Sequence, residues 1–171
     1  MKSAHRQAAR AKRQRVHAVS TYGLLDTLFA APDKPMPEAK RTFQLTRMYE
    51  GLRAMEQAPN PGTDDWRVVS DAVNLMETLV RIGWCEDNTG LLVDAVAAMA
   101  LAGARHLQDG APIRLDGRGI AAVRAVLADY AEMLETLSER TMTQCHRLTE
   151  RRIYQIQAGQ RKAHDVEIMK L

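Results

Sequence analysis

The chain has 171 residues, and its 25 alanines and 17 leucines against 2 phenylalanines favour helices and exclude an all-β sandwich or barrel. Its two cysteines, Cys85 and Cys145, exclude a disulfide framework and a four-cysteine zinc site. The longest apolar run, residues 95–104, is half of the ~20 residues that a membrane span needs, and no secretory signal is visible, so we expect a cytoplasmic protein that does not cross a membrane.

The net charge of +3 conceals a strong pattern along the chain. Residues 1–57 carry a charge of +6, residues 58–139 carry −7 and residues 140–171 carry +4. Basic ends that flank an acidic middle favour an anionic partner. The alternative is that the basic ends fold back onto the acidic middle of the same molecule, although each such surface attraction is weak.

The first 25 residues contain no acidic side chain. In a helix, Arg6, Arg10, Arg13 and His17 would share one face, since they follow one another at spacings of four, three and four residues. The alanines between them favour a helix but are too small to drive packing into a core. We expect this segment to fold against a polyanion and to bind nucleic acid. Its candidate phosphate-binding residues are Lys2, Arg6, Arg10, Lys12, Arg13 and Arg15.

Residues 2–17 resemble the arginine-rich RNA-binding helices of phage antitermination proteins. The resemblance implies an RNA partner that is held through its phosphates. Three alternatives stay open for the same residues: a solvated tail, a mitochondrial-type presequence, and an arm that binds an acidic protein.

Proline and glycine divide the next part of the chain into helices. A short apolar segment, residues 22–30, and a helix from Pro37 to about residue 57 precede the sequence Ala-Pro-Asn-Pro-Gly at 58–62, the best candidate for a hinge. The next helix starts at Thr63, as the N-cap, and ends before Gly83. Residues 91–107 are apolar on all sides, which predicts a central helix that neighbours enclose.

A long final helix is predicted from Asp116, its N-cap, to about Gln157, because no helix breaker intervenes before Gly159. Its apolar seam repeats at spacings of three and four residues and consists of Ile120, Val123, Leu127, Tyr130, Leu134 and Leu137. The fold class is therefore all-α, a single-domain bundle of five or six helices with a long C-terminal helix. We divide the chain into a basic arm (1–20), the bundle (21–159) and a tail (160–171).

Two motifs suggest other chemistry, and both have simpler explanations. Gly117-Arg118-Gly119 begins a dinucleotide-binding pattern, but no strands are predicted to build the sheet that such a site requires, so we interpret the glycines as a flexible helix start. Cys145, His146 and Glu150 lie close enough on a helix to suggest a metal, but no further ligand is spaced to complete a zinc site. We expect no metal, no cofactor and no catalytic residue.

A second basic region lies at the end of the long helix, where Tyr154 could stack on a base. Its candidate nucleic-acid-binding residues are Arg140, Arg147, Arg151 and Arg152, and a solvated helix end is the alternative. The sequences Thr-Met-Thr-Gln-Cys-His-Arg at 141–147 and Thr-Glu-Arg-Arg-Ile at 149–153 resemble small uncharacterised helical proteins of proteobacterial prophages and conjugative plasmids. Over residues 113–170, the resemblance implies a regulator, accessory factor or inhibitor encoded by a mobile element.

Two functions follow from these features, and neither is enzymatic. The first is a regulatory or accessory protein that contacts nucleic acid, or a nucleoprotein complex, through its two basic regions. The second is an adaptor or inhibitor that binds a protein partner through the acidic middle, with Trp66 or Trp84 as the apolar anchor. We also expect a homodimer, because the long helix beyond Thr141 has few apolar partners of its own.

Overall fold

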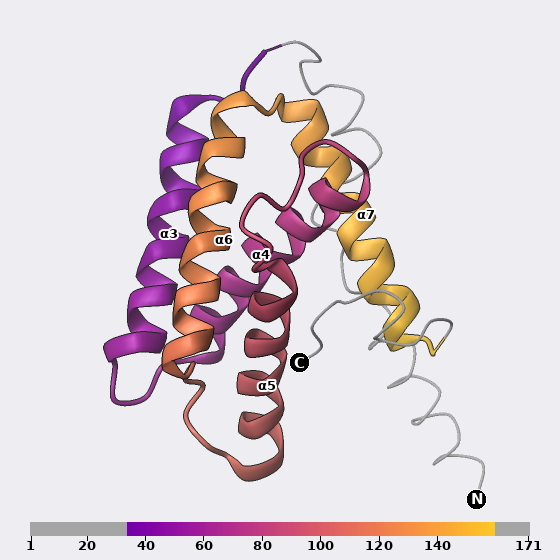
Figure 1. The fold of residues 1–171 in the computed structure, drawn as a ribbon. Coiled ribbons are helices and arrows are strands. Elements are labelled where there is room, and N and C mark those ends of the chain that lie inside the picture. Colours follow the sequence, from indigo (N-terminus) through magenta and orange to yellow (C-terminus); the bar gives the residue numbers. More distant parts are fainter. Residues whose placement is uncertain (1–33, 160–171) are drawn as a thin grey trace, which may run out of the picture.

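A computed structural model describes residues 34–159 of the chain, and the described residues form an all-α bundle without strands (Figure 1). The predicted basic arm, the apolar segment at 22–30 and the tail at 160–171 lie outside them. An isolated β-bridge joins Pro35 to Ser138. The helices are α3 (Glu38–Gln57), α4 (Thr63–Arg81), α5 (Leu92–Asp109), α6 (Gly117–Thr136) and α7 (Glu139–Gln157).

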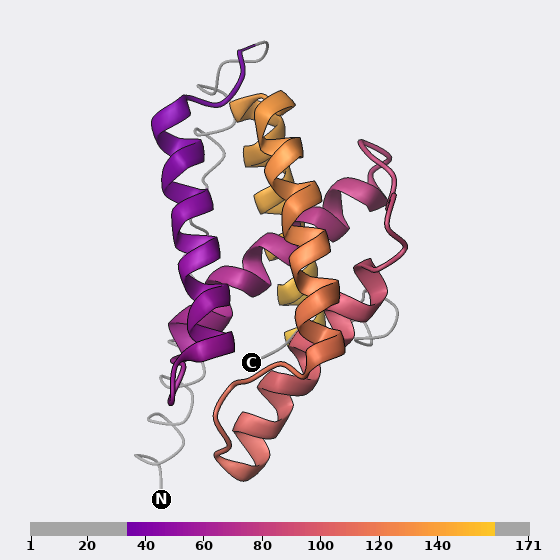
Figure 2. The same cartoon turned by 60° about the vertical axis from the view of Figure 1, so that its left-hand side comes forward.

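Helix α4 is the centre of the bundle, and it contacts each of the other four described helices. Figure 2 shows α4 crossing α3 and α6 at a steep angle. The prediction that residues 91–107 form the central helix is therefore wrong, because α5 packs on α4 and α6 alone and leaves one face exposed. The buried residues of α4 are Trp66, Val69, Ser70, Ala72, Val73, Asn74, Leu75, Met76, Glu77, Thr78 and Leu79.

The predicted 40-residue C-terminal helix is two helices in the structure. Leu137 and Ser138 have extended backbones, with ψ angles of 134° and 154°, and they separate α6 from α7. The Ser138 hydroxyl accepts a hydrogen bond from the Thr141 N–H at 3.1 Å and so caps α7. The Leu137 carbonyl accepts from the Met36 N–H at 3.1 Å. Apolar spacing continues through the break, which is why the periodicity did not reveal it.

The apolar seam is confirmed over the length of α6. Val123, Leu127, Tyr130, Leu134 and Leu137 are buried, and Ile120 is partly buried against the same core. Helix α7 packs on α4 through side chains beyond Thr141, although its C-terminal end diverges from the other described helices (Figure 1). Met142 and Cys145 are buried in the main core, so the expectation that this segment has few apolar partners of its own, on which the homodimer rested, does not hold for them.

Two predicted helix ends are confirmed and one is displaced. Asp116 caps α6 by accepting from the Gly119 N–H at 2.6 Å, and Gly83 follows α4 with a φ of +71°, where a side chain would be strained. The N-cap of α4 is Gly62 and not Thr63. The Asp65 carboxylate, one turn into the helix, accepts from the Gly62 N–H at 2.8 Å, so an acidic side chain replaces the expected hydroxyl.

Candidate nucleic-acid interface

Helix α7 has an inward face that packs on the bundle and an outward face that carries arginines. The inward side chains of Met142, Cys145, Thr149 and Ile156 are buried. A small apolar cluster of Ile153 and Ile156 occupies the end of the helix. This packing fixes the rotation of α7, and the rotation decides which of the predicted basic residues lie outward.

Arg152 lies on the inward face and is engaged in a buried ion pair. Its Nη2 lies 3.1 Å from Oε1 of Glu77, a side chain that is 2% exposed and lies one turn before the end of α4. Arg81, one turn further along α4, donates to the same Glu77 oxygen from Nε at 2.9 Å. Arg152 is therefore a residue of the bundle's interior. The structure separates it from the basic surface to which the sequence assigned it.

Two threonines continue this polar contact between α4 and α7. The Thr78 hydroxyl donates to the Asn74 carbonyl at 2.9 Å, which uses its only hydrogen. It must therefore accept from the Thr149 hydroxyl at 2.6 Å, and it also accepts from Nη1 of Arg152 at 3.2 Å. No sequence pattern predicts this cluster, because a glutamate and two threonines in amphipathic helices ordinarily face water.

Burial displaces the titrations of several side chains in this part of the bundle, among them Glu77 and His146. It raises the pKa of Glu77 from 4.5 to about 7, although the two arginines act to lower it. It lowers the pKa of His146 from 6.5 to about 4, which keeps the imidazole neutral, while the nearby Glu150 acts in the opposite sense. Both groups are thereby biased towards their uncharged forms, as expected where desolvation outweighs neighbouring charges.

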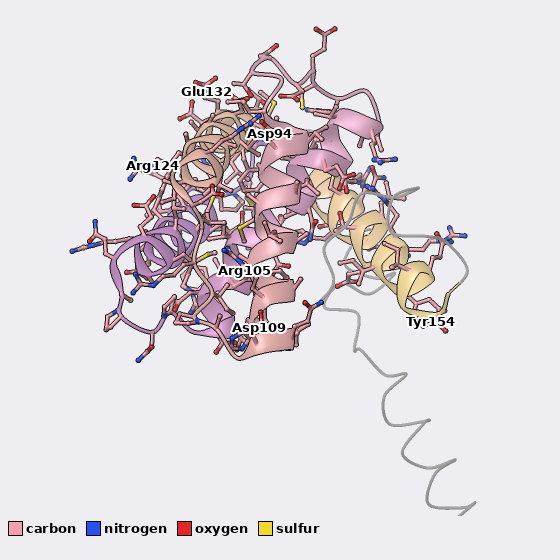
Figure 3. The ribbon with its side chains drawn as sticks, turned by 60° about the horizontal axis from the view of Figure 1, so that its bottom comes forward. Asp94, Arg105, Asp109, Arg124, Glu132 and Tyr154 are labelled. Carbon is pink, nitrogen blue, oxygen red and sulfur yellow. The ribbon has the colours of Figure 1, made fainter. Side chains whose placement is uncertain are left out.

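The outward face of α7 brings together three of the predicted arginines. Arg140, Arg147 and Arg151 follow one another at spacings of seven and four residues, so they form one stripe along the helix. Arg151 is exposed, and Arg140 and Arg147 are partly exposed. The exposed Tyr154 follows Arg151 by one turn, and in Figure 3 it lies at the end of α7, turned away from the other helices. We call these four residues the α7 stripe.

The six candidate residues of the N-terminal arm, Lys2, Arg6, Arg10, Lys12, Arg13 and Arg15, lie outside the described part of the chain. The site geometry given above therefore includes only the α7 stripe. They remain a prediction from the sequence.

The motifs that suggested other chemistry have structural roles among the described residues. Gly119 permits a close contact, since a Cβ at this position would lie 2.8 Å from the Ala98 Cβ on α5. Cys145 is buried, and its burial raises the thiol pKa to about 11, which disfavours the thiolate that nucleophilic attack requires. Across residues 34–159, no three His, Cys, Asp or Glu side chains gather as they would around a metal ion.

The two tryptophans occupy opposite environments. Trp66 is 4% exposed in the core, where its indole N–H donates to the Met99 carbonyl at 3.0 Å, so it offers no surface to a partner. Trp84 is 50% exposed just after α4, beside the exposed Ile82. Asp87 and Asp129 lie near the adjacent Cys85, since both raise the pKa of this half-buried thiol, after its desolvation. Of the two predicted anchors, only Trp84 lies at the surface.

Comparisons of the chain with protein-family models, with curated proteins and with solved structures found no match. Among the described helices, none is both long enough and apolar enough to cross a membrane.

Proposed function

We propose that this protein is a non-enzymatic accessory or regulatory protein that binds the phosphate backbone of nucleic acid through the α7 stripe. The observation that carries the proposal is the grouping of Arg140, Arg147 and Arg151 with an exposed Tyr154 on the outward face of one helix. The same rotation of α7 assigns Arg152 to the interior, and the partly exposed Glu150 borders the stripe one turn after Arg147. The basic N-terminal arm adds a second region of the same chemistry.

The expected mode of binding is electrostatic, with little discrimination between sequences. The three arginines span 11 residues, or ~16 Å at ~1.5 Å per residue, which matches a few successive phosphates. Guanidinium groups bind phosphate oxygens in bidentate fashion, and the Tyr154 ring offers a stacking surface to an unpaired base. A single-stranded partner would use both features.

The test is the salt dependence of binding to a fluorescently labelled 30-nucleotide RNA of random sequence. Neutralising the stripe in an Arg140→Gln, Arg147→Gln, Arg151→Gln variant should reduce the slope of log affinity against log salt by about 2 to 3, at ~0.7–0.9 per lost phosphate contact. The matched control neutralises the exposed Arg47, Arg53 and Arg67 on α3 and α4, which removes the same charge elsewhere. It should leave the slope close to that of the unmodified chain.

Removing residues 2–17 tests the contribution of the arm separately. If all six basic residues meet phosphates, the deletion should remove a slope of about 4 to 5. Equal losses in the stripe variant and its control would show that net charge alone matters, and the proposal for the α7 stripe would fail. Binding that does not respond to salt would contradict nucleic-acid binding through either region.

A second candidate function is that of an adaptor or inhibitor that binds a basic protein surface. The observation in its favour is the exposed apolar pair of Trp84 and Ile82, which lies at the end of α4 within the acidic middle of the chain. In that case a Trp84→Ala variant should lose the partner, whereas neutralising the α7 stripe should leave binding unchanged. A pull-down from the native host, with and without nuclease, distinguishes the two functions.

A further inference from the structure

Helix α5 exposes an apolar face, although it lies in the middle of the chain. Val93, Leu101 and Leu107 are 61%, 55% and 63% exposed. Between them lie the exposed Ala97 and the partly exposed Ala100 and Ala104. We call these six residues the α5 stripe. It runs nearly the length of the helix without a charged residue, whereas the other side of α5 packs on α4 and α6.

The α5 stripe explains why the sequence of this helix is apolar on all sides. Within the bundle of the described helices, the face of α5 that lies away from α4 and α6 needs no apolar side chain. A continuous apolar surface of this kind on an exposed helix typically marks an interface with another molecule. By contrast, helices α4 and α6 expose no large apolar side chain.

We propose that a second copy of this chain covers the stripe, with the two α5 helices antiparallel about a two-fold axis close to Ala100 and Leu101. In this register Ala97 lies opposite Ala104 of the second copy, which allows the two helices to approach closely. Leu101 then enters the hole that Ala97, Ala100 and Ala104 of the second copy border, as a knob in antiparallel helix packing. The stripe is thus complementary to itself, as a two-fold interface requires.

Charge supports the same arrangement. Asp94 and Arg105 lie along one edge of the stripe, on opposite sides of its centre between Ala100 and Leu101. Both lie on the side of α6, because Asp94 pairs with Arg118 at 3.0 Å and Arg105 donates to the Arg114 carbonyl at 2.7 Å. Figure 3 views α5 with Asp94 near its start and Arg105 in its second half.

A two-fold axis at the centre reverses the helix direction and keeps this edge on the same side. Asp94 of one copy therefore lies beside Arg105 of the other, twice per dimer. Each retains capacity for a second contact, since a carboxylate has two oxygens and a guanidinium has five N–H donors. In a parallel pair about a two-fold axis along the helices, this edge would lie on opposite sides of the interface in the two copies, so Asp94 and Arg105 of different copies would not meet.

Sedimentation velocity of the full chain from about 1 to 100 μM measures the fraction of dimer as a function of concentration. The Leu101→Glu variant tests the centre of the interface. Two carboxylates at the axis should weaken dimerisation at least about tenfold. The residue is half exposed, so the fold should be retained, which circular dichroism verifies. Phe43→Glu on α3 is the matched control, because Phe43 is also a large exposed apolar residue (66% against 55% for Leu101) and lies outside the stripe, and it should leave the dimer unchanged.

Charge reversal tests the register. Asp94→Arg and Arg105→Asp should each weaken the dimer about tenfold, and the double variant should restore it to within about threefold, since opposite charges again face each other. Oxidative cross-linking should join Ala100→Cys chains and not Val93→Cys chains, because position 93 lies far from its own copy in an antiparallel pair. The cross-linking uses a Cys85→Ser background.

A monomer at every concentration would overturn the proposal. So would a dimer that persists in Leu101→Glu, or one that Phe43→Glu dissociates equally. Efficient cross-linking through position 93 would contradict the antiparallel arrangement. No residue of the α7 stripe takes part in this interface, so failure here leaves the test of nucleic-acid binding unaffected.

Discussion

At the scale of single residues, the buried carboxylate of Glu77 is the least expected feature of the bundle. A charge at the centre of a helical core is costly unless charged and polar partners surround it. Here Arg152 approaches from α7 and Arg81 from the following turn of α4. The contact links α4 to α7 through two residues, Glu77 and Arg152, that are 75 positions apart in the chain. It thereby fixes how α7 rotates, and hence where the α7 stripe faces.

The displaced pKa values of Glu77 and His146 have opposite effects on stability. Folded Glu77 holds its proton more tightly than the unfolded chain, so it lowers the free energy of unfolding as the pH rises from 4.5 to about 7. Folded His146 holds its proton less tightly, so it raises this free energy as the pH rises from about 4 to 6.5. Each effect amounts to about 3–4 kcal/mol at ~1.4 kcal/mol per pKa unit, so the contributions of these two groups nearly cancel each other.

Removing either group should therefore reveal the other. His146→Asn should become less stable, relative to the unmodified protein, as the pH rises from 4.5 to 7, and Glu77→Gln should become relatively more stable over the same range. Urea unfolding at intervals of half a pH unit measures both trends. Curves for the three proteins that run parallel would show that neither group titrates differently in the folded chain.

At the scale of the helices, two glycines allow close approach. A Cβ on Gly51 of α3 would lie 2.8 Å from the Asp65 carbonyl oxygen of α4, and one on Gly119 of α6 would lie 2.8 Å from the Ala98 Cβ of α5. Both distances are too short for atoms in van der Waals contact. Gly119 therefore allows the close spacing of α5 and α6. This packing role accounts for the glycine without a dinucleotide-binding site.

This close contact predicts different effects for two neighbouring glycines. Gly119→Ala should destabilise the fold by about 1–3 kcal/mol, because the added methyl group overpacks the contact between the helices. Gly117→Ala has open space around it and should be neutral or stabilising by up to about 1 kcal/mol, as usual for Ala in a helix. Thermal unfolding measures both.

The companion variant Ala98→Gly removes the atom that the new methyl group would meet. Combined with Gly119→Ala, it should recover part of the lost stability. The recovery is incomplete, because a glycine within α5 has a lower helix propensity than the alanine it replaces. If the double variant is as unstable as the sum of the two single variants, the Cβ contact is not the cause.

At the scale of the whole molecule, one continuous apolar core joins all the described helices. The core includes Met48 and Met55 of α3, Met99 of α5 and Leu134 of α6, and Met142 and Cys145 extend it into α7. Helix α4 runs through the middle of this core, so no helix can leave without exposing its buried face. Such an arrangement favours a single cooperative unfolding transition.

The two tryptophans offer a test of this cooperativity. In a Trp66→Phe variant the remaining Trp84 reports from the surface, and in a Trp84→Phe variant Trp66 reports from the core. In each variant, the fluorescence and far-ultraviolet circular dichroism transitions in urea should coincide, because one core unfolds at once. A Trp84 signal that changes at lower urea than the circular dichroism would show that the turn after α4 opens separately.

Much of the bundle follows from the sequence alone. The helices and most of their limits are local properties, set by apolar periodicity, by Pro37 and the sequence at 58–62, and by Gly83 and Asp116. The apolar seam of α6 was identifiable for the same reason. The excess of arginine near the C-terminus and the lack of a metal-ligand pattern are likewise visible in the chain itself.

Only the tertiary structure decided which helix is central, where the long C-terminal segment breaks and which arginines face outward. Periodicity gives the width of an apolar face but not what covers it, so α5 looked enclosed and α4 did not. The spacing of apolar residues continues through Leu137 and Ser138, so only packing against Met36 and α4 reveals the turn. Arg151 and Arg152 are adjacent and chemically identical, yet one faces outward and the other pairs with Glu77, because a distant helix supplies the carboxylate.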